Sequence, residues 1–408
     1  MRLGEYLGFY EKEERNVEKY LSARISSWIS DREADESFAV FGGNVQQRNR
    51  VTEQGIARCF GRIGVIVIHN NEFLEQDLMH ILEIYPELLS GYGKTPVCYI
   101  NQNNLNYMPL LGMEPDRAAE VIYPELSRES PMYLQQHLYA DGLKRYLRIL
   151  QYRDLPLTLG SLLYLCRLDL EALETRELSR IPEAFASEIL SGLMQDNVTR
   201  QIRADVESFA GQLYGRIWGG QGGGGASILT AARNRALISI RVPSHNASVL
   251  NYLSAELSQV LELGIPCLLV IDSVQLGNSL LRGIITAPGG SVPKILSGSS
   301  VQELCGETPN SGSALLYQFG KIILFQCANA AVAAQYSDMI GNYLRRFMTM
   351  TENKSRGAFD LFSGHGRGES FSMQEYARIK PEELMRLGNG AVLIDQVSGR
   401  IQMTKNLV

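Results

Sequence analysis

The sequence lacks the features on which several protein classes depend. No apolar run approaches the ~18 residues of a membrane span. The first 21 residues carry acidic side chains where a secretory signal peptide would need an apolar stretch. The six cysteines form no CxxC pair and the five histidines do not cluster, which argues against a zinc site or a disulfide framework. We therefore expect a cytoplasmic protein with no metal site and no direct membrane span.

Charge of one sign is also lacking. The chain has 39 lysine and arginine residues against 44 aspartate and glutamate residues, a net charge of -5. A protein that grips duplex DNA through a broad basic face would need a clear basic excess. Nucleic acid is therefore possible as a partner but is not favoured.

Continuous apolar runs then indicate the fold class. The 408 residues are 45% hydrophobic, enough for two domains of the usual ~150 residues. Short β-branched runs such as Ser37–Phe41, Val65–Ile68 and Cys267–Ile271 alternate with helical patterns. Such strands, apolar on both faces, are typical of a parallel sheet covered by helices on both sides. The sequence predicts a doubly wound, mostly parallel α/β sheet.

A long helical segment interrupts this pattern. From about residue 116 to residue 218, apolar residues recur at three- and four-residue spacing and no strand pattern appears. We predict four parts: an amphipathic helical segment (1–36), the first part of the α/β domain (37–115), an all-α insertion (116–218) and the second part of the α/β domain (219–408). The glycine-rich run Gly219–Gly225 is expected to be a mobile loop or a domain junction.

The loop after the first strand is a candidate phosphate-binding loop. It reads Gly42-Gly43-Asn-Val-Gln-Gln47-Arg48-Asn49 and precedes a helix expected from about Val51. In the pattern GxxxxGK[ST], the second glycine lets the backbone approach the phosphate, the lysine bridges the phosphates and the hydroxyl holds Mg²⁺. Those three positions hold Gln47, Arg48 and Asn49. Only the positive charge of Arg48 is kept, so this loop taken alone favours an ordinary strand-to-helix turn.

The apolar strand ending at Asp272 is a second candidate. An aspartate at this place can orient Mg²⁺, and a following glutamate can polarise the attacking water. Here the following residue is Ser273. Many strands end in aspartate because it suits the next turn. Two further segments are expected to be structural: His69 as a turn residue, and Gly364–Glu369 as a flexible loop.

The order of several motifs carries a family resemblance. Asn106–Leu110 (NYMPL) looks like an "NPL" motif ahead of an all-α domain, and Ile265–Gly277 is similar to "PVLLLLDEFxxLG". Leu316–Phe325 looks like a segment containing "NCGTKIVF", and Lys380–Leu387 is similar to "LTPDELMRLP". In this order, the chain resembles the coupling ATPases of type IV secretion and conjugation, the TraG/TraD-like members of the FtsK/HerA superfamily. The resemblance implies a P-loop NTPase-like (RecA/FtsK-like) fold and a hexameric ring.

Several departures from that family fall on catalytic positions. Gln47, Arg48 and Asn49 replace the phosphate-loop residues, Ser273 replaces the glutamate, and Gly298 stands where the family has a phosphate-sensing glutamine. Losing one such group typically costs on the order of a hundred- to a thousandfold in rate. We therefore expect no significant ATPase activity and no cofactor.

Two functions stay open at this point. The first is a catalytically degenerate structural or recruiting subunit. It would act with protein subunits of a conjugation- or secretion-like complex, as a homo-oligomer or paired with an active ATPase, in the cytoplasm or peripheral to a membrane complex. The alternative is a divergent translocation ATPase that binds ATP and Mg²⁺ through Arg48 and Asp272.

Overall fold

The computed structural model describes residues 17–28, 37–79, 96–127, 136–193, 196–220, 225–242, 246–277, 279–287, 292–305, 315–354 and 365–407. The chain forms two compact units. One comprises residues 25–320, and the other joins the residues up to 24 to those from 321 onward.

The larger unit is built on six parallel strands. They run in the order β2 (Phe38–Phe41), β7 (Lys294–Gly298), β6 (Cys267–Asp272), β3 (Gly64–His69), β5 (Leu237–Arg241) and β4 (Val97–Ile100). Nearly every residue of the four inner strands is buried. Continuous apolar runs form such strands because both faces of the sheet are covered.

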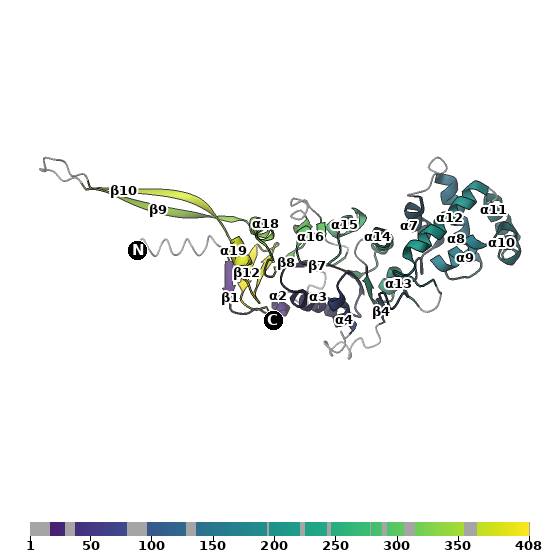
Figure 1. Ribbon diagram of the computed structural model, residues 1–408, viewed down its shortest axis with the longest axis horizontal. Helices are drawn as coiled ribbons and strands as arrows, with labels where there is room; N and C mark the ends of the chain where they lie inside the picture. Colours follow the sequence, from purple (N-terminus) through teal and green to yellow (C-terminus); the bar gives the residue numbers. More distant parts are fainter. Residues whose placement is uncertain are drawn as a thin grey trace. The chain divides into compact units, whose positions relative to one another are not determined.

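Helices cover both faces of this sheet. Figure 1 shows α3 (Val45–Cys59) and α4 (Glu72–Met79) on one side, and α14 (Ala247–Glu262), α15 (Ser279–Thr286) and α16 (Val301–Cys305) on the other. The short helices α2 (Ile25–Trp28) and α13 (Ile228–Arg233) complete the α/β part of this unit. The predicted doubly wound, mostly parallel fold is confirmed.

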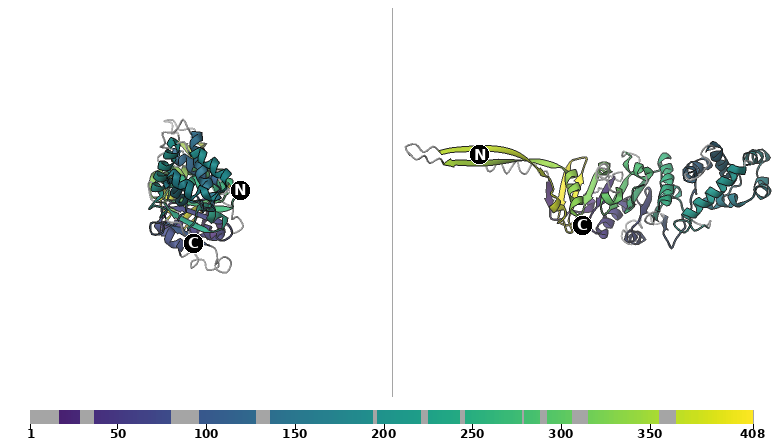
Figure 2. Two further views of the ribbon diagram at one scale, coloured as in Figure 1. Left: turned by 90° about the vertical axis from the view of Figure 1, so that its right-hand side faces the viewer. Right: turned by 45° about the horizontal axis from the view of Figure 1, so that its top comes forward.

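A helical region lies between β4 and β5 in the chain. It comprises α7 (Pro115–Ser127), α8 (Gln136–Tyr152), α9 (Leu159–Arg167), α10 (Leu170–Arg176), the 3₁₀ turn η2 (Leu178–Arg180), α11 (Glu183–Leu193) and α12 (Asp196–Leu213). These helices gather at one end of the view on the right of Figure 2. Within the described ranges, none of the helices has both the length and the apolar character needed to cross a membrane.

The segments that enter and leave the helical region are joined by backbone hydrogen bonds. The Tyr107 N–H donates to the Ile217 carbonyl (3.1 Å), and the Gly219 N–H donates to the Leu105 carbonyl (2.9 Å). Gly225 packs so closely that a Cβ there would lie 2.1 Å from the Asn106 carbonyl oxygen. Glycine is required at this point because only a residue without a side chain allows this approach.

A buried carboxyl group joins these segments to α14. Glu256 is 0% exposed, and its carboxyl accepts hydrogen bonds from the Tyr107 hydroxyl and from the Leu229 N–H (3.3 Å). The neighbouring Tyr252 hydroxyl accepts from the Leu110 N–H (2.8 Å). Burial raises the pKa of Glu256, and the hydrogen bond from Tyr107 opposes that rise. The carboxyl group therefore ties the segment before the helical region to α13.

The smaller unit contains a four-stranded sheet and a separate ribbon. The sheet runs in the order β1 (Val17–Tyr20), β12 (Arg400–Thr404), β11 (Ala391–Asp395) and β8 (Lys321–Leu324), with β1 parallel to β12 and the other pairs antiparallel. Helices α18 (Ala330–Ile340) and α19 (Pro381–Leu384) belong to this unit. The ribbon consists of β9 (Asn342–Lys354) and β10 (His365–Ala377), paired antiparallel over their whole length.

Two local predictions are wrong. Val17–Tyr20 forms strand β1, where amphipathic helices were expected, because pairing with β12 supplies its backbone hydrogen bonds; most of residues 1–36 lies outside the described residues. The segment expected to be a flexible loop is, from His365 onward, the first part of β10. In both cases pairing with another strand overrides the local pattern.

Candidate nucleotide site at the carboxyl ends of the strands

Four neighbouring strands of the larger unit end at one edge of the sheet. The register sets Phe41 opposite Gly298, Ser297 opposite Asp272, and Asp272 opposite His69. Ligands of open parallel sheets bind at the carboxyl ends of the strands. The structure thus brings the loop after β2, the end of β6 and Gly298 to the same edge.

The loop after β2 is shorter than predicted. Helix α3 begins at Val45, not near Val51, so only three residues separate it from the strand. Gly42 and Gly43 both have left-handed backbone angles (φ 79° and 59°), which make the tight turn. Gln47, Arg48 and Asn49 therefore lie within α3 and not in a loop that could surround a phosphate group.

A capping box fixes the start of the helix. The Asn44 side chain accepts from the Gln47 N–H (2.8 Å), and the Gln47 side chain accepts from the Asn44 N–H (3.0 Å). Two of the N–H groups that a phosphate would use are already occupied by these side chains. The spacing Asn-x-x-Gln is the sequence pattern that could have located this helix start.

Arg48 points back to the glycine turn. Its Nη1 donates to the carbonyl oxygens of Gly42 (2.9 Å) and Gly43 (3.1 Å), and the residue is 5% exposed. Burial lowers the pKa of Arg48, while the charges of Asp272 and Glu303 raise it. The guanidinium group is thus bound by the chain itself at the position where a phosphate-loop lysine would reach for phosphate.

Asp272 is part of a chain of buried hydrogen bonds. Its Oδ2 accepts from the Asn71 side-chain amide (2.7 Å), which also donates to the side-chain Oδ1 of Asn49 (2.9 Å). The Asn49 amide in turn donates to Asp77 (2.8 Å). Burial raises the pKa of Asp272, and the hydrogen bond from Asn71 and the charge of Arg48 oppose that rise. Sequence reasoning did not include Asn71 or Asp77 in the site. Asn71 follows β3 and Asp77 lies in α4, and both are far from Asp272 in the chain.

Packing constrains Ser273 and Gly298, the two remaining positions at which the resembled family has catalytic residues. Ser273 has a left-handed φ of 56°, unusual for a serine, and its N–H donates to the Ser297 carbonyl (2.9 Å). A Cβ added at Gly298 would lie 3.0 Å from Leu304. A glutamine at that position would therefore require Leu304 to move.

His69 was predicted to be a turn residue, and this prediction is wrong. It is the last residue of β3 and is 0% exposed. Its Nε2 lies 2.9 Å from the Ser239 hydroxyl and its Nδ1 lies 3.0 Å from the Asn71 carbonyl oxygen. Burial lowers the pKa of His69 to about 4, so the ring is neutral at physiological pH. The described residues contain no cluster of three or more side chains suited to a metal ion.

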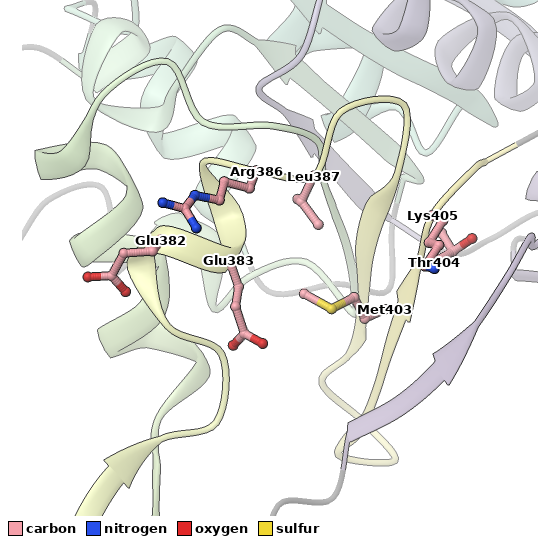
Figure 3. A pocket seen from close by; sticks show the side chains of 7 residues that line it. All are labelled: Glu382, Glu383, Arg386, Leu387, Met403, Thr404 and Lys405. Carbon is pink, nitrogen blue, oxygen red and sulfur yellow. The ribbon is translucent and has the colours of Figure 1, made fainter.

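One cavity in the smaller unit has no counterpart among the predicted sites. Its volume is about 280 Å³, and it is lined by Glu382, Glu383, Arg386, Leu387, Met403, Thr404 and Lys405. Figure 3 shows that these residues come from α19, from the turn that follows it and from the end of β12. Two acidic and two basic side chains balance, so the cavity has no charge preference for one ligand class.

Comparison with known proteins identifies the fold. No protein-family model matches the sequence, and none of the curated proteins matches it. Solved structures of a bacterial conjugative coupling protein do match. The unbound form of TrwBdeltaN70 has a TM-score of 0.52 at 12% identity, over 91% of this chain and 85% of that chain. The chain has the fold of a conjugative coupling protein.

A second structure leads to the same conclusion. Plasmid coupling protein TrwB in complex with the non-hydrolysable GTP analogue GDPNP matches with a TM-score of 0.51 and 12% identity, over 91% of this chain and 86% of that chain. At this identity the likeness concerns the fold. It agrees with the resemblance drawn from the order of the sequence motifs.

Proposed function

We propose that this chain is a catalytically degenerate, coupling-ATPase-like protein. It acts as a structural or recruiting subunit of a conjugation- or secretion-like assembly, and it does not hydrolyse ATP. The observation that carries the proposal is the closed loop after β2, where side chains of the protein occupy the groups that would hold a phosphate.

The residues present do not fit a nucleoside triphosphate with its magnesium ion. A phosphate would have to displace the Asn44–Gln47 capping box and release Arg48 from the two glycine carbonyls. An N-cap contributes typically about 1 kcal/mol, and hydrogen bonds to a charged group about 1.5–3 kcal/mol. Binding would therefore cost several kcal/mol of existing interactions before any phosphate contact is made.

The metal position is poorly suited as well. One oxygen of Asp272 is used by Asn71, and Asn49 supplies an amide where Mg²⁺ would need a hydroxyl. Ser273 cannot act as the carboxylate that polarises water. Because these parts act together in phosphoryl transfer, their combined loss supports a role without hydrolysis.

The retained fold then suggests what the protein does instead. A sheet and a helical region of the coupling-protein type offer surfaces for protein subunits, either further copies of this chain or an active ATPase. The likeness to coupling proteins also supports a location in the cytoplasm or at the periphery of a membrane complex.

One observation favours the alternative of a divergent ATPase. Arg48 and Asp272 lie close enough for their charges to shift each other's pKa, and the second carboxylate oxygen of Asp272 has no hydrogen-bond partner in the described part of the chain. A nucleotide that reorganised the loop could use both groups. A neighbouring subunit would then have to supply the missing catalytic groups.

Calorimetry separates the two functions. Mg²⁺-ATP is titrated into the full chain and into the variants Arg48→Ala and Arg50→Ala, where Arg50 is an exposed arginine of the same helix and serves as the matched control. No binding heat up to millimolar nucleotide is expected for any of the three. Binding that Arg48→Ala abolishes and Arg50→Ala retains would contradict the proposal and support the divergent ATPase.

A further inference from the structure

Four buried polar atoms beneath helix α3 make no hydrogen bond within the chain. They are Nε of Arg48, Oγ1 of Thr52, Oδ1 of Asp272 and Oγ of Ser297, and none of them has a partner in the described part of the chain. The four residues are between 0% and 5% exposed, so bulk solvent does not reach these atoms. Unpaired buried polar groups are costly, and four such atoms therefore require a partner.

The sheet brings two of these groups to one point. Strands β6 and β7 pair in parallel with Asp272 opposite Ser297. Ile295 of β7 points toward α3, because a Cβ added at Gly55 would lie 2.5 Å from the Ile295 Cδ1. Ser297 is two residues further along the strand and points to the same face, as does the Asp272 side chain beside it. Both groups thus face α3 at the carboxyl ends of their strands.

Helix α3 supplies the other two groups. Arg48 and Thr52 are four residues apart, so their side chains lie on the same face of the helix. The helix packs against both β6 and β7. The charges of Arg48 and Asp272 each shift the pKa of the other residue, and the Ser297 hydroxyl is near enough to lower the pKa of Asp272. The four unpaired atoms therefore converge between the helix and the two strands.

The chemistry of these groups indicates which ligand could serve all of them. The Arg48 Nε only donates a hydrogen bond, the Asp272 carboxylate only accepts one, and the two hydroxyl groups can do either. A cation would be repelled by Arg48 and an anion by Asp272, so a neutral ligand fits better. A water molecule donates two hydrogen bonds and accepts two. Polar groups that lie close without a direct hydrogen bond are typically joined by such a water.

We propose that one buried water molecule is bound beneath α3, where it joins Arg48 to Asp272 and is hydrogen-bonded to the hydroxyl groups of Thr52 and Ser297. Water, and not a metal ion or a phosphate, then occupies the second oxygen of Asp272. The inference deepens the proposed function and rests on it in one respect, namely that no nucleotide occupies the site. Its test uses the free chain without nucleotide, so it and the calorimetric test of the proposed function can fail separately.

Removing each hydroxyl group tests the site by the sign of the effect. Thr52→Val and Ser297→Ala each remove one hydroxyl from the full chain, and urea denaturation measures the unfolding equilibrium constant. If the hydroxyls are bound to a water molecule, each substitution should raise this constant about three- to tenfold. If they are unpaired in a dry interior, the apolar replacement removes a cost and the constant should fall.

A third threonine provides the matched control. The Thr199 hydroxyl donates directly to the Leu193 carbonyl (2.7 Å), and the residue is 6% exposed. Thr199→Val therefore shows how far the loss of a paired, buried hydroxyl raises the unfolding constant of this chain. The Thr52→Val/Ser297→Ala double variant shows whether the two hydroxyls share a partner. With one shared water, its effect should differ at least threefold from the product of the single effects.

A crystal structure of the full chain gives an independent measurement. A solvent peak within hydrogen-bonding distance of the Arg48 Nε and the Asp272 Oδ1, together with destabilisation by both single substitutions, supports the proposal. Stabilisation by either substitution overturns it, and so do independent effects in the double variant. A metal ion, a phosphate group or no density at this point would overturn it as well.

Discussion

Replacing Glu256 by alanine should loosen the connection between the helical region and α14. The substitution leaves the buried Tyr107 hydroxyl and the Leu229 N–H without their acceptor. Each unsatisfied buried donor costs about 1–3 kcal/mol, and removing the desolvated carboxyl group returns part of this. We expect the free energy of unfolding to fall by roughly 3 kcal/mol. Glu256→Gln keeps one carbonyl acceptor and should cost about 1 kcal/mol.

The measurement combines urea denaturation with hydrogen exchange. Exchange should accelerate in residues 105–111 and 226–232, which the carboxyl group joins, and far less in β6. A double-variant cycle with Tyr107→Phe isolates the hydrogen bond, with an expected coupling of about 1–2 kcal/mol. An alanine variant within about 0.5 kcal/mol of wild type, or strictly additive effects, would refute the reasoning.

The same carboxyl group gives a pH dependence of known sign. Because burial raises the pKa of Glu256 above its ordinary value of 4.5, the folded protein binds this proton more tightly than the unfolded chain. Its contribution to stability is fully present below that value and is lost as pH rises through the raised pKa. Stability measured against pH should therefore decline less steeply for Glu256→Gln than for wild type over this range.

Three further predictions concern other positions. Gly225→Ala should destabilise the protein by about 1–3 kcal/mol in thermal denaturation, since its Cβ would meet the Asn106 carbonyl oxygen. Gly277 has open space around it, so the control variant Gly277→Ala should not destabilise the protein. Equal effects of the two substitutions would contradict this prediction. Asn44→Ala should cost about 1 kcal/mol in urea denaturation through the lost helix cap, and no loss would show that the cap contributes nothing. For His69 the lowered pKa of about 4 means that stability is full above its ordinary value of 6.5 and is lost as pH falls toward 4, by on the order of 3 kcal/mol. An unchanged acid slope in a well-folded His69→Gln variant would contradict that assignment.

Much of the fold was predictable because its signals are local. The strand Cys267–Asp272 is an unbroken apolar run, and the helical region follows a three- and four-residue apolar spacing. Both patterns reflect burial of the element's own residues and can be read without knowing the partner. The start of α3 was missed although its signal is also local, since Asn44 and Gln47 are three residues apart.

The state of the candidate site depended on residues that meet only in the folded chain. Asn71 and Asp272 are 201 residues apart in sequence, yet their hydrogen bond occupies the carboxylate that would face a metal ion. Strand β1 likewise owes its conformation to β12, at the other end of the chain. The sequence by itself determined which segments are strands and helices in the buried core and which catalytic residue types are missing. Only the tertiary structure showed that several of the remaining polar groups of the candidate site are hydrogen-bonded to other side chains of the protein. Such long-range hydrogen bonds leave no periodic pattern in the sequence.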